Sequence, residues 1–386
     1  MAKQEEITDD NIQIGMPVIY RDGVLVGKIV DSDKNSSKMI LITDSNSSIG
    51  TYIQNETNSP GIVMGKLGLS LEMQLIPQSE EIKIKTKDGE EELIAYPAGS
   101  KILKKELNFL TGGGGTNTAV AFSRLGLNVA YLGKMGQGSN SGLIVKRLRK
   151  EKVKFVGVNS KTFHAGYSVI LDSLSGDRTI LTYKGANNHL RFSEINKRKI
   201  KAKWFYFSSM IGESYKTLEK LAIFGKENGI KIAFNPSNYL AEKGSEFLGK
   251  LLLNTDLLIL NKEESELIVG KGEIKHLIQK LMELGPKEVI ITDGKKGAYT
   301  ISKNYFYNVV PHKVHAVETT GAGDAFASTY LASKIMGKEI IDSLKLASSN
   351  SGSVVQNRGA KNGLLEYKPL LLESKKYPAK IKKKKI

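Results

Sequence analysis

Residues 318–326 read Glu-Thr-Thr-Gly-Ala-Gly-Asp-Ala-Phe, and an apolar, helix-like run follows them to Met336. A glycine turn that enters a helix leaves several backbone N–H groups without intrahelical partners. These donors and the positive end of the helix dipole favour an anion, and glycine lets the backbone approach it closely. The turn at Gly321 is therefore predicted to hold an anion with the backbone of Ala322, Gly323 and Asp324.

Asp324 stands at the predicted start of this helix, beside the place where negative charge would gather. A carboxylate there repels phosphate, but it is well suited to take a proton from a hydroxyl that attacks phosphorus. Asp324 is thus a candidate general base. A motif this short also fits a plain helix N-terminus that Asp324 merely caps.

A second glycine-rich stretch lies upstream, where residues 112–119 read Gly-Gly-Gly-Gly-Thr-Asn-Thr-Ala before a helix-like run to Gly126. Glycine at Gly113 and Gly114 permits close approach to a hydroxyl-rich ligand. The amide of Asn117 can both donate and accept hydrogen bonds to such a ligand. The alternative is a turn with a packing role only.

The two stretches resemble the C-terminal signature and the N-terminal sugar-binding signature of the ribokinase-like (PfkB) carbohydrate kinases. They occur in that family's order and at about its spacing, and the likeness covers residues 96–365. The resemblance implies an ATP-dependent kinase that phosphorylates a hydroxyl of a sugar or nucleoside, with Mg²⁺ bridging the ATP phosphates. It implies a doubly wound α/β sandwich with a small β lid.

The resemblance also implies further site residues. Asn187 lies in a segment similar to the one that leads to the family's sugar site. Residues 261–264, Asn-Lys-Glu-Glu, match the family's Asn-x-x-Glu motif, so Asn261 and Glu264 are implied in positioning phosphate and Mg²⁺. A magnesium ion keeps several waters, so Glu264 acting through water fits it. A helix-capping Asn261 with surface glutamates is the alternative.

The resemblance also assigns residues to the nucleotide site. Thr292, Gly294 and Gly297 look like the family's contact with the nucleotide phosphates, and Asn350 falls where the family lines its adenine pocket. Short apolar runs alternate with helical stretches through this part of the chain, which argues for a parallel sheet covered by helices on both faces. The runs are residues 204–208, 230–234, 257–260 and 289–292, with helical stretches such as 215–228 and 274–284. Residues 167–172 and 178–183 alternate as a hairpin.

Two departures from the family are visible. The family usually opens with a buried strand ending in an aspartate that grips substrate hydroxyls, and no such strand precedes Tyr96. Gly138 or its neighbour stands where a loop aspartate is usual. A nucleotide-binding protein that has lost catalysis, a pseudokinase or sensor, is therefore an alternative to an active kinase.

Short β-type runs punctuated by Gly, Asp, Asn and Ser fill residues 16–87 and predict a small all-β domain. This pattern resembles the β domain of the cell-shape protein MreC, which implies an interaction module and leaves a cell-shape scaffold as a third alternative. We place the domain boundary near residue 90, beside a hairpin turn signal at Asp88-Gly89. The expected organisation is a β domain over 1–90, a kinase domain over 91–370 and a basic disordered tail over 371–386.

The composition narrows the class of protein. The chain has 386 residues, no cysteine and a net charge of +17, and seven lysines lie among residues 375–385. The absence of cysteine excludes disulfides and thiolate metal sites. No apolar run is long enough to span a membrane, and the N-terminus lacks the apolar core of a signal peptide, so a cytoplasmic protein is expected. Tyr377 is the one aromatic residue among these lysines, so neither a nucleic acid nor a membrane is a firm partner; a homodimer stays open.

Overall fold

The computed structural model describes residues 12–20, 24–32, 37–41, 48–52, 60–66, 70–74, 81–86, 89–94, 109–172 and 178–386. The chain divides into two units, one of Met1–Leu107 with Val169–Leu181 and one of Asn108–Ser168 with Thr182–Ile386. The division at residue 107 comes later in the chain than the expected boundary near residue 90. Each unit is described by itself below.

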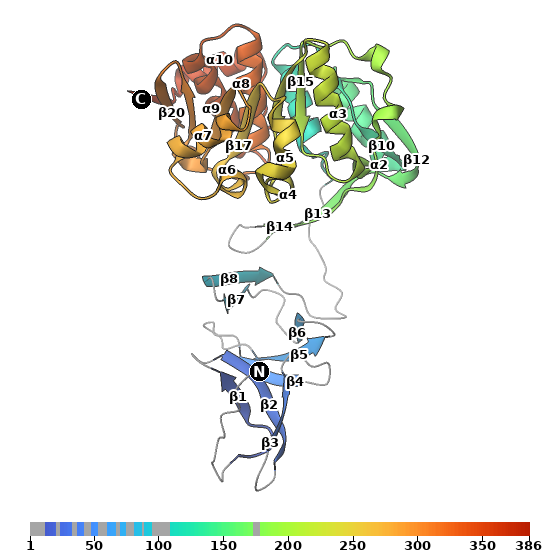
Figure 1. The fold of residues 1–386 in the computed structure, drawn as a ribbon, viewed down its shortest axis with the longest axis vertical. Coiled ribbons are helices and arrows are strands. Elements are labelled where there is room, and N and C mark those ends of the chain that lie inside the picture. The colour runs from blue at the N-terminus through green and yellow to red at the C-terminus, as the bar shows by residue number, and fades with distance from the viewer. Residues whose placement is uncertain are drawn as a thin grey trace. The chain divides into compact units, whose positions relative to one another are not determined.

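The larger unit is built on a seven-stranded sheet (Figure 1). Its strands lie side by side in the order in which they occur in the chain. β15 to β18 run parallel, and the remaining strands pair antiparallel. The strands are β15 (Trp204–Ser208), β16 (Lys231–Asn235), β17 (Leu257–Asn261), β18 (Glu288–Thr292), β19 (Ala298–Ser302), β20 (Tyr305–Val310) and β21 (Lys380–Lys385).

Both faces of this sheet are buried. Successive side chains of a strand point to opposite faces, so each strand contributes to two cores. In β17, Leu258 and Leu260 enter one apolar core, while Leu257 and Ile259 enter the other. This double burial explains why the parallel strands read as continuous apolar runs. The prediction of an α/β sandwich is confirmed.

Helices cover the two faces. The first core takes leucines and isoleucines from α3 (Glu213–Glu227), α5 (Gly244–Leu252) and α7 (Ile274–Glu283). The second core takes apolar residues from α1 (Gly114–Arg124), α8 (Ala322–Ile335), α9 (Ile340–Val355) and α10 (Tyr367–Lys376). The helices α8 and α1 therefore lie on the same face, which brings the two glycine-rich stretches together.

Shorter elements complete this unit. α2 (Ser139–Lys150), α4 (Asn238–Ala241) and α6 (Lys262–Val269) are its remaining α-helices among the described residues. Small parallel pairs join β9 (Ala130–Tyr131) to β11 (Lys154–Phe155) and β10 (Lys134–Gln137) to β12 (Val158–His164). The predicted hairpin of β13 (Tyr167–Asp172) and β14 (Arg178–Tyr183) belongs mainly, over Val169–Leu181, to the other unit, and its turn lies outside the described residues.

The N-terminal unit is all β among its described residues, as predicted. It contains a three-stranded antiparallel sheet of β1 (Pro17–Tyr20), β2 (Val24–Ser32) and β3 (Ser37–Leu41). A second such sheet joins β4 (Ser48–Tyr52), β5 (Pro60–Lys66) and β6 (Ser70–Gln74). β7 (Glu81–Thr86) pairs antiparallel with β8 (Gly89–Ile94), on either side of the expected turn; Asp88 itself lies outside the described residues.

The C-terminal lysine-rich segment is ordered, so the prediction of a disordered tail over 371–386 is wrong. β21 pairs antiparallel with β20 along its whole length. Ala379 is buried and Ile381 packs against the second core. The Lys383 ammonium lies 3.9 Å from the centre of the Tyr305 ring. Lysine stems lie along apolar surface and the ammonium is attracted to an aromatic face, so a lysine-rich strand can pack well.

Candidate active site

The turn before α8 explains why its glycine is needed. Gly321 precedes the helix with φ 83°, in the left-handed region that favours glycine. A Cβ there would lie 2.5 Å from the Cβ of Ala360, so no larger residue fits. The Ala322 N–H donates to the Thr319 carbonyl at 3.2 Å. Space is open above Gly323, where a Cβ would meet nothing within 4 Å. The turn can therefore admit a ligand at Gly323 and Asp324.

Asp324 and Asn117 meet across the interface between α8 and α1. The Asn117 side chain donates Nδ2–H to Oδ2 of Asp324 at 2.7 Å. Oδ1 of Asp324 lies 3.1 Å from the point that a Cβ on Gly114 would occupy. The structure thus brings Gly114, Asn117 and Asp324 together, and the glycine keeps the space beside the carboxylate free.

Lys361 is a site residue that the sequence analysis missed. Its side chain is buried, with 4% of the residue exposed. The ammonium donates to Oδ1 of Asn117 at 2.5 Å and to the Thr111 carbonyl at 2.6 Å. The available signal in the sequence is its place directly after Gly359-Ala360, a small-residue pair that follows the helix carrying Asn350.

Burial dominates the electrostatics of this cluster. It raises the pKa of Asp324, while the Asn117 hydrogen bond and the charge of Lys361 oppose that rise. Burial lowers the pKa of Lys361 to about 7, and the Asp324 carboxylate opposes that fall. A carboxylate whose pKa is raised towards neutrality is a better proton acceptor, as a general base requires.

Two residues of β15 also reach the cluster without having been predicted. Ser208 Oγ lies 2.6 Å from the position of a Cβ on Gly114. Tyr206 buries its hydroxyl without a hydrogen-bond partner, and the charges of Asp324 and Glu264 add to burial in raising its pKa. Ser208 ends its strand, so the rule that function gathers at strand ends could have found it.

The ends of β17 and β18 form the neighbouring part of this edge, where Asn261 and Thr292 pair in register. Oδ1 of Asn261 accepts from the Glu264 N–H at 2.7 Å, and Oε2 of Glu264 accepts from the Asn261 N–H at 2.8 Å. This reciprocal capping box agrees with the helix-capping Asn261 of the alternative, but Glu264 is buried and not on the surface. Burial, then the charges of Glu263 and Asp324, raise the pKa of Glu264 to about 7.

The other predicted nucleotide residues fall into different surroundings. Gly294 has φ 48° and open space around it. Gly297 has φ 100°, and a Cβ there would lie 1.8 Å from the Val309 carbonyl oxygen, so strand packing alone requires glycine. Asn350 is fully buried, donating to Thr329 Oγ1 at 2.8 Å and accepting from the Leu365 N–H at 2.9 Å. Its amide joins helices rather than lining an open pocket.

The remaining predicted residues lie on the acceptor side. Gly113 precedes α1 with φ 90° and open space around it, and its carbonyl accepts from the Asn117 N–H at 3.0 Å. Asn187 is exposed, and its Nδ2 lies 2.5 Å from the position of a Cβ on Gly166. Gly138 precedes α2 with φ 98°, so the departure from the family's aspartate coincides with a backbone that favours glycine.

The donor set fits a magnesium ion that is held mainly by its ligand. Among the described residues, no three His, Asp or Glu side chains gather as a metal cage. Magnesium usually keeps waters and takes one or two carboxylates together with substrate phosphates. Glu264, on whose pKa the Asp324 charge acts, is the carboxylate that the sequence predicts for that task.

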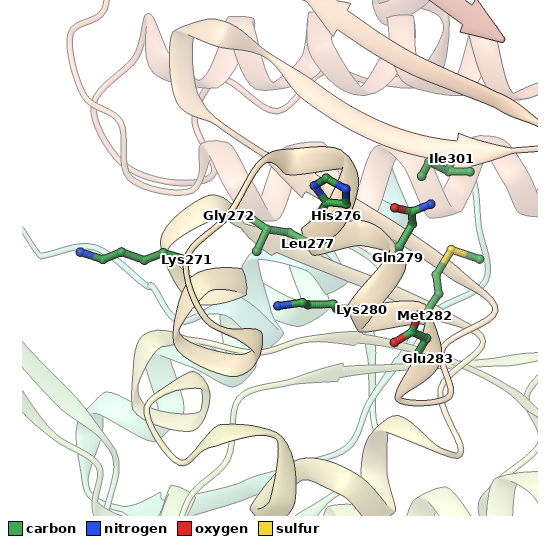
Figure 2. Close-up of a pocket in the computed structure, with 9 residues that line it drawn as sticks. All are labelled: Lys271, Gly272, His276, Leu277, Gln279, Lys280, Met282, Glu283 and Ile301. Atoms are coloured by element: carbon green, nitrogen blue, oxygen red, sulfur yellow. The ribbon is translucent and has the colours of Figure 1, made fainter. Parts of the chain in front are cut away.

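A cavity of about 680 Å³ lies away from these residues, along α7 (Figure 2). Lys271, His276 and Lys280 line it, with Ile301 of β19 on its far side. None of the predicted site residues contributes to it.

Among the described residues, the helices are too short or too polar to span a lipid bilayer.

Comparison with known proteins bears on the two parts of the chain separately. A family model described as pfkB family carbohydrate kinase matches residues 78–366, and one described as Rod shape-determining protein MreC, barrel core, matches residues 8–91. An uncharacterized sugar kinase of Archaeoglobus fulgidus is 26% identical over 64% of this chain and 98% of its own. The ribokinase of Staphylococcus aureus is 24% identical over 73% of this chain and 92% of its own.

Solved structures share the fold of the larger unit. An Escherichia coli protein, provisionally assigned as ribokinase II and solved with ATP and Mg²⁺, superposes with a TM-score of 0.65 at 21% identity. The match covers 73% of this chain and 95% of that one.

Proposed function

Because the chain belongs to the pfkB family of carbohydrate kinases, we propose that it transfers the γ-phosphoryl group of ATP to a hydroxyl of a sugar or nucleoside. The observation that carries this proposal is the meeting of Asn117 with Asp324 at the start of α8. A buried carboxylate at the N-terminus of a helix suits the deprotonation of a hydroxyl that attacks phosphorus.

The acceptor oxygen forms a bond to the γ-phosphorus, its proton passes to Asp324, and the bond to the bridging oxygen of ADP breaks. The backbone N–H groups of Gly323 and Asp324 stabilise the charge on the transferred group, because they lie at the positive end of α8. Little covalent chemistry is asked of the protein in such a transfer, where positioning and charge dominate.

The nucleotide is proposed to lie over the ends of β17 and β18, since Asn261 and Thr292 are neighbours there. Gly294 leaves room for its phosphates. Mg²⁺, when bound, neutralises phosphate charge, and Glu264 is the residue that would hold it through water. The acceptor is proposed to lie against Gly113, Gly114 and Asn117, with Asn187 as a further contact.

Affinity for the acceptor is expected to be weak. We find no counterpart of the family's first-strand aspartate between the β domain and Tyr96, and among the described residues β15 pairs only with β16. A hydrogen bond to a charged group contributes about 1.5–3 kcal/mol. Its loss weakens binding by about ten- to 150-fold.

The test is a phosphorylation screen with γ-labelled ATP and Mg²⁺ over ribose, deoxyribose, fructose and nucleosides. Labelled product from at least one acceptor is the expected result. ATP binding without transfer to any acceptor would favour the nucleotide-binding pseudokinase instead.

The N-terminal unit is proposed to be an interaction module, because residues 8–91 match the MreC barrel core. Capture of a cell-shape protein by this unit, with no kinase activity in the chain, would support the scaffold alternative.

A further inference from the structure

Lys361 lies in the loop between α9 and α10 and connects three parts of the site. Its ammonium lies between the Thr111 carbonyl, at 2.6 Å, and Oδ1 of Asn117, at 2.5 Å. Thr111 directly precedes the glycine turn on the acceptor side. Gly359, at the start of the loop, is fixed by donating its N–H to Glu318 at 2.8 Å.

The ammonium determines how the Asn117 amide is turned. An ammonium has donors only, so the amide oxygen must face Lys361 and the amide nitrogen must face Asp324. The reverse rotation would place two donors against each other at Lys361. It would also place the amide oxygen against the Asp324 carboxylate, so both contacts would become repulsive.

We propose that Lys361 is a positioning residue for Asp324. It fixes Asn117 as a donor to Oδ2, and it keeps the carboxylate ionised with Oδ1 beside Gly114, where the acceptor is proposed to lie. This inference rests on the proposed function, because it assigns a role in the same site.

The charges around Lys361 support an action on Asp324. Arg124 and Arg147 also face it, but both pair with Glu151, at 2.7 and 2.9 Å. Arg124 further holds the loop by donating to the carbonyls of Lys361 at 3.0 Å and Leu364 at 2.7 Å. The Asp324 carboxylate is thus the partner of Lys361 across Asn117.

The other groups that act on Asp324 come from different elements. Tyr206 of β15 and Glu264 of α6 both interact with its charge. Glu264 repels the Asp324 carboxylate, and removing Lys361 takes away the cation whose charge opposes the rise in the pKa of Asp324. The proton on Asp324 should then be lost only at higher pH.

The test compares Lys361→Met and Lys361→Arg with wild type, using the acceptor that the screen identifies. In Lys361→Met we expect the acid limb of kcat/KM to move up by about one pH unit and kcat to fall roughly 10- to 100-fold. The KM for ATP should change less than about twofold. Lys361→Arg should restore most of the acid limb, because it keeps charge and donors. An unmoved acid limb in folded Lys361→Met overturns the proposal.

A matched control is Lys134→Met. Lys134 is also buried and donates to the His189 carbonyl at 2.8 Å and to Glu194 at 2.7 Å. This variant should lower the melting temperature and leave the acid limb unmoved. An equal shift in both variants would mean that any buried lysine acts alike, which contradicts the proposal.

A second readout needs no acceptor and separates the two proposals. Titration of the Asp324 carboxyl carbon by NMR should give a higher midpoint in Lys361→Met than in wild type; equal midpoints overturn the inference. A higher midpoint, together with a screen that yields no product, would sustain the positioning role and reject phosphotransfer. If Lys361→Met does not fold, Lys361→Gln, which keeps a donor without the charge, is titrated in its place.

Discussion

Asn117 donates its side-chain N–H to Asp324 across 207 residues of sequence, with 2.7 Å between Nδ2 and Oδ2. One residue lies on α1 and the other on α8, and both helices begin at a glycine turn. The turn on the acceptor side and the turn before the proposed base are therefore held at a fixed separation. Substitutions on either helix should therefore alter the geometry at the Asp324 carboxylate.

Replacement of Asp324 by Asn should lower kcat about 10²- to 10⁴-fold, the usual contribution of a general base. The fold and the affinity for ATP should be retained, since the change is isosteric. Turnover with the best acceptor and calorimetric titration with an ATP analogue give both quantities. Asp342→Asn, at an exposed position in the first turn of α9, is the control and should leave kcat unchanged. Near wild-type turnover in the Asp324 variant would remove this residue from the base role.

Gly114→Ala should impair use of the acceptor more than binding of the nucleotide. The new methyl group would meet Ser208 Oγ at 2.6 Å and Asp324 Oδ1 at 3.1 Å, so it occupies the space beside the carboxylate. We expect kcat/KM for the acceptor to fall at least tenfold, with the KM for ATP nearly constant, as steady-state kinetics would show. Gly142→Ala in α2, where a Cβ meets nothing within 4 Å, is the matched control. Equal kinetics in the two variants would speak against an acceptor at Gly114.

Glu264→Gln should change how stability depends on pH. Burial raises the pKa of Glu264 to about 7, so the folded state keeps a proton that the unfolded state loses from about pH 4.5. The wild-type free energy of unfolding should therefore fall as pH rises through this window and level off above it. The neutral variant should be more stable at pH 8 by on the order of 2 kcal/mol. Urea unfolding at several pH values measures this, and exposed Glu242→Gln is the control. A variant with the wild-type slope would contradict the assignment.

Asn350→Ala should destabilise the protein without weakening the nucleotide complex. The amide bonds to Thr329 and Leu365 in a fully buried position, and its loss leaves buried polar groups unpaired. We expect the free energy of unfolding to fall by about 1–3 kcal/mol. Thermal unfolding and the KM for ATP separate the two readings. An unchanged melting temperature with a raised KM for ATP would instead support the predicted contact of Asn350 with adenine.

Deletion of residues 378–386 should destabilise the larger unit, because β21 covers the edge of β20. Loss of the contacts of Ala379 and Ile381 with the core is expected to cost roughly 2 kcal/mol. Chemical unfolding of the shortened chain measures the loss. Lys384→Ser, which keeps the strand, should unfold like wild type. Unchanged stability in the deletion would indicate that the pairing contributes nothing.

The sequence predicted the elements with strong local patterns and missed what depends on distant contacts. The runs around Leu257 and Val289 became buried strands because their apolar character matches two-sided burial. Lys361 could not be recognised, since a lysine in a loop resembles any exposed charge until Asn117 and Thr111 are seen beside it. Composition alone predicted a disordered lysine-rich tail. Ile381 lies among these lysines and packs against the second core, which holds the strand in place.

The strand order of the large sheet has a consequence for the order of folding. Every neighbouring pair from β15 to β20 is consecutive in the chain, so these pairings close relatively short loops. The contact between Asn117 and Asp324 closes a far longer one. We expect amide protons of β16 to β18 to gain protection from hydrogen exchange earlier during refolding than those of α1. An intermediate with its sheet formed would then lack the assembled site, so catalytic competence would be among the last properties the chain acquires.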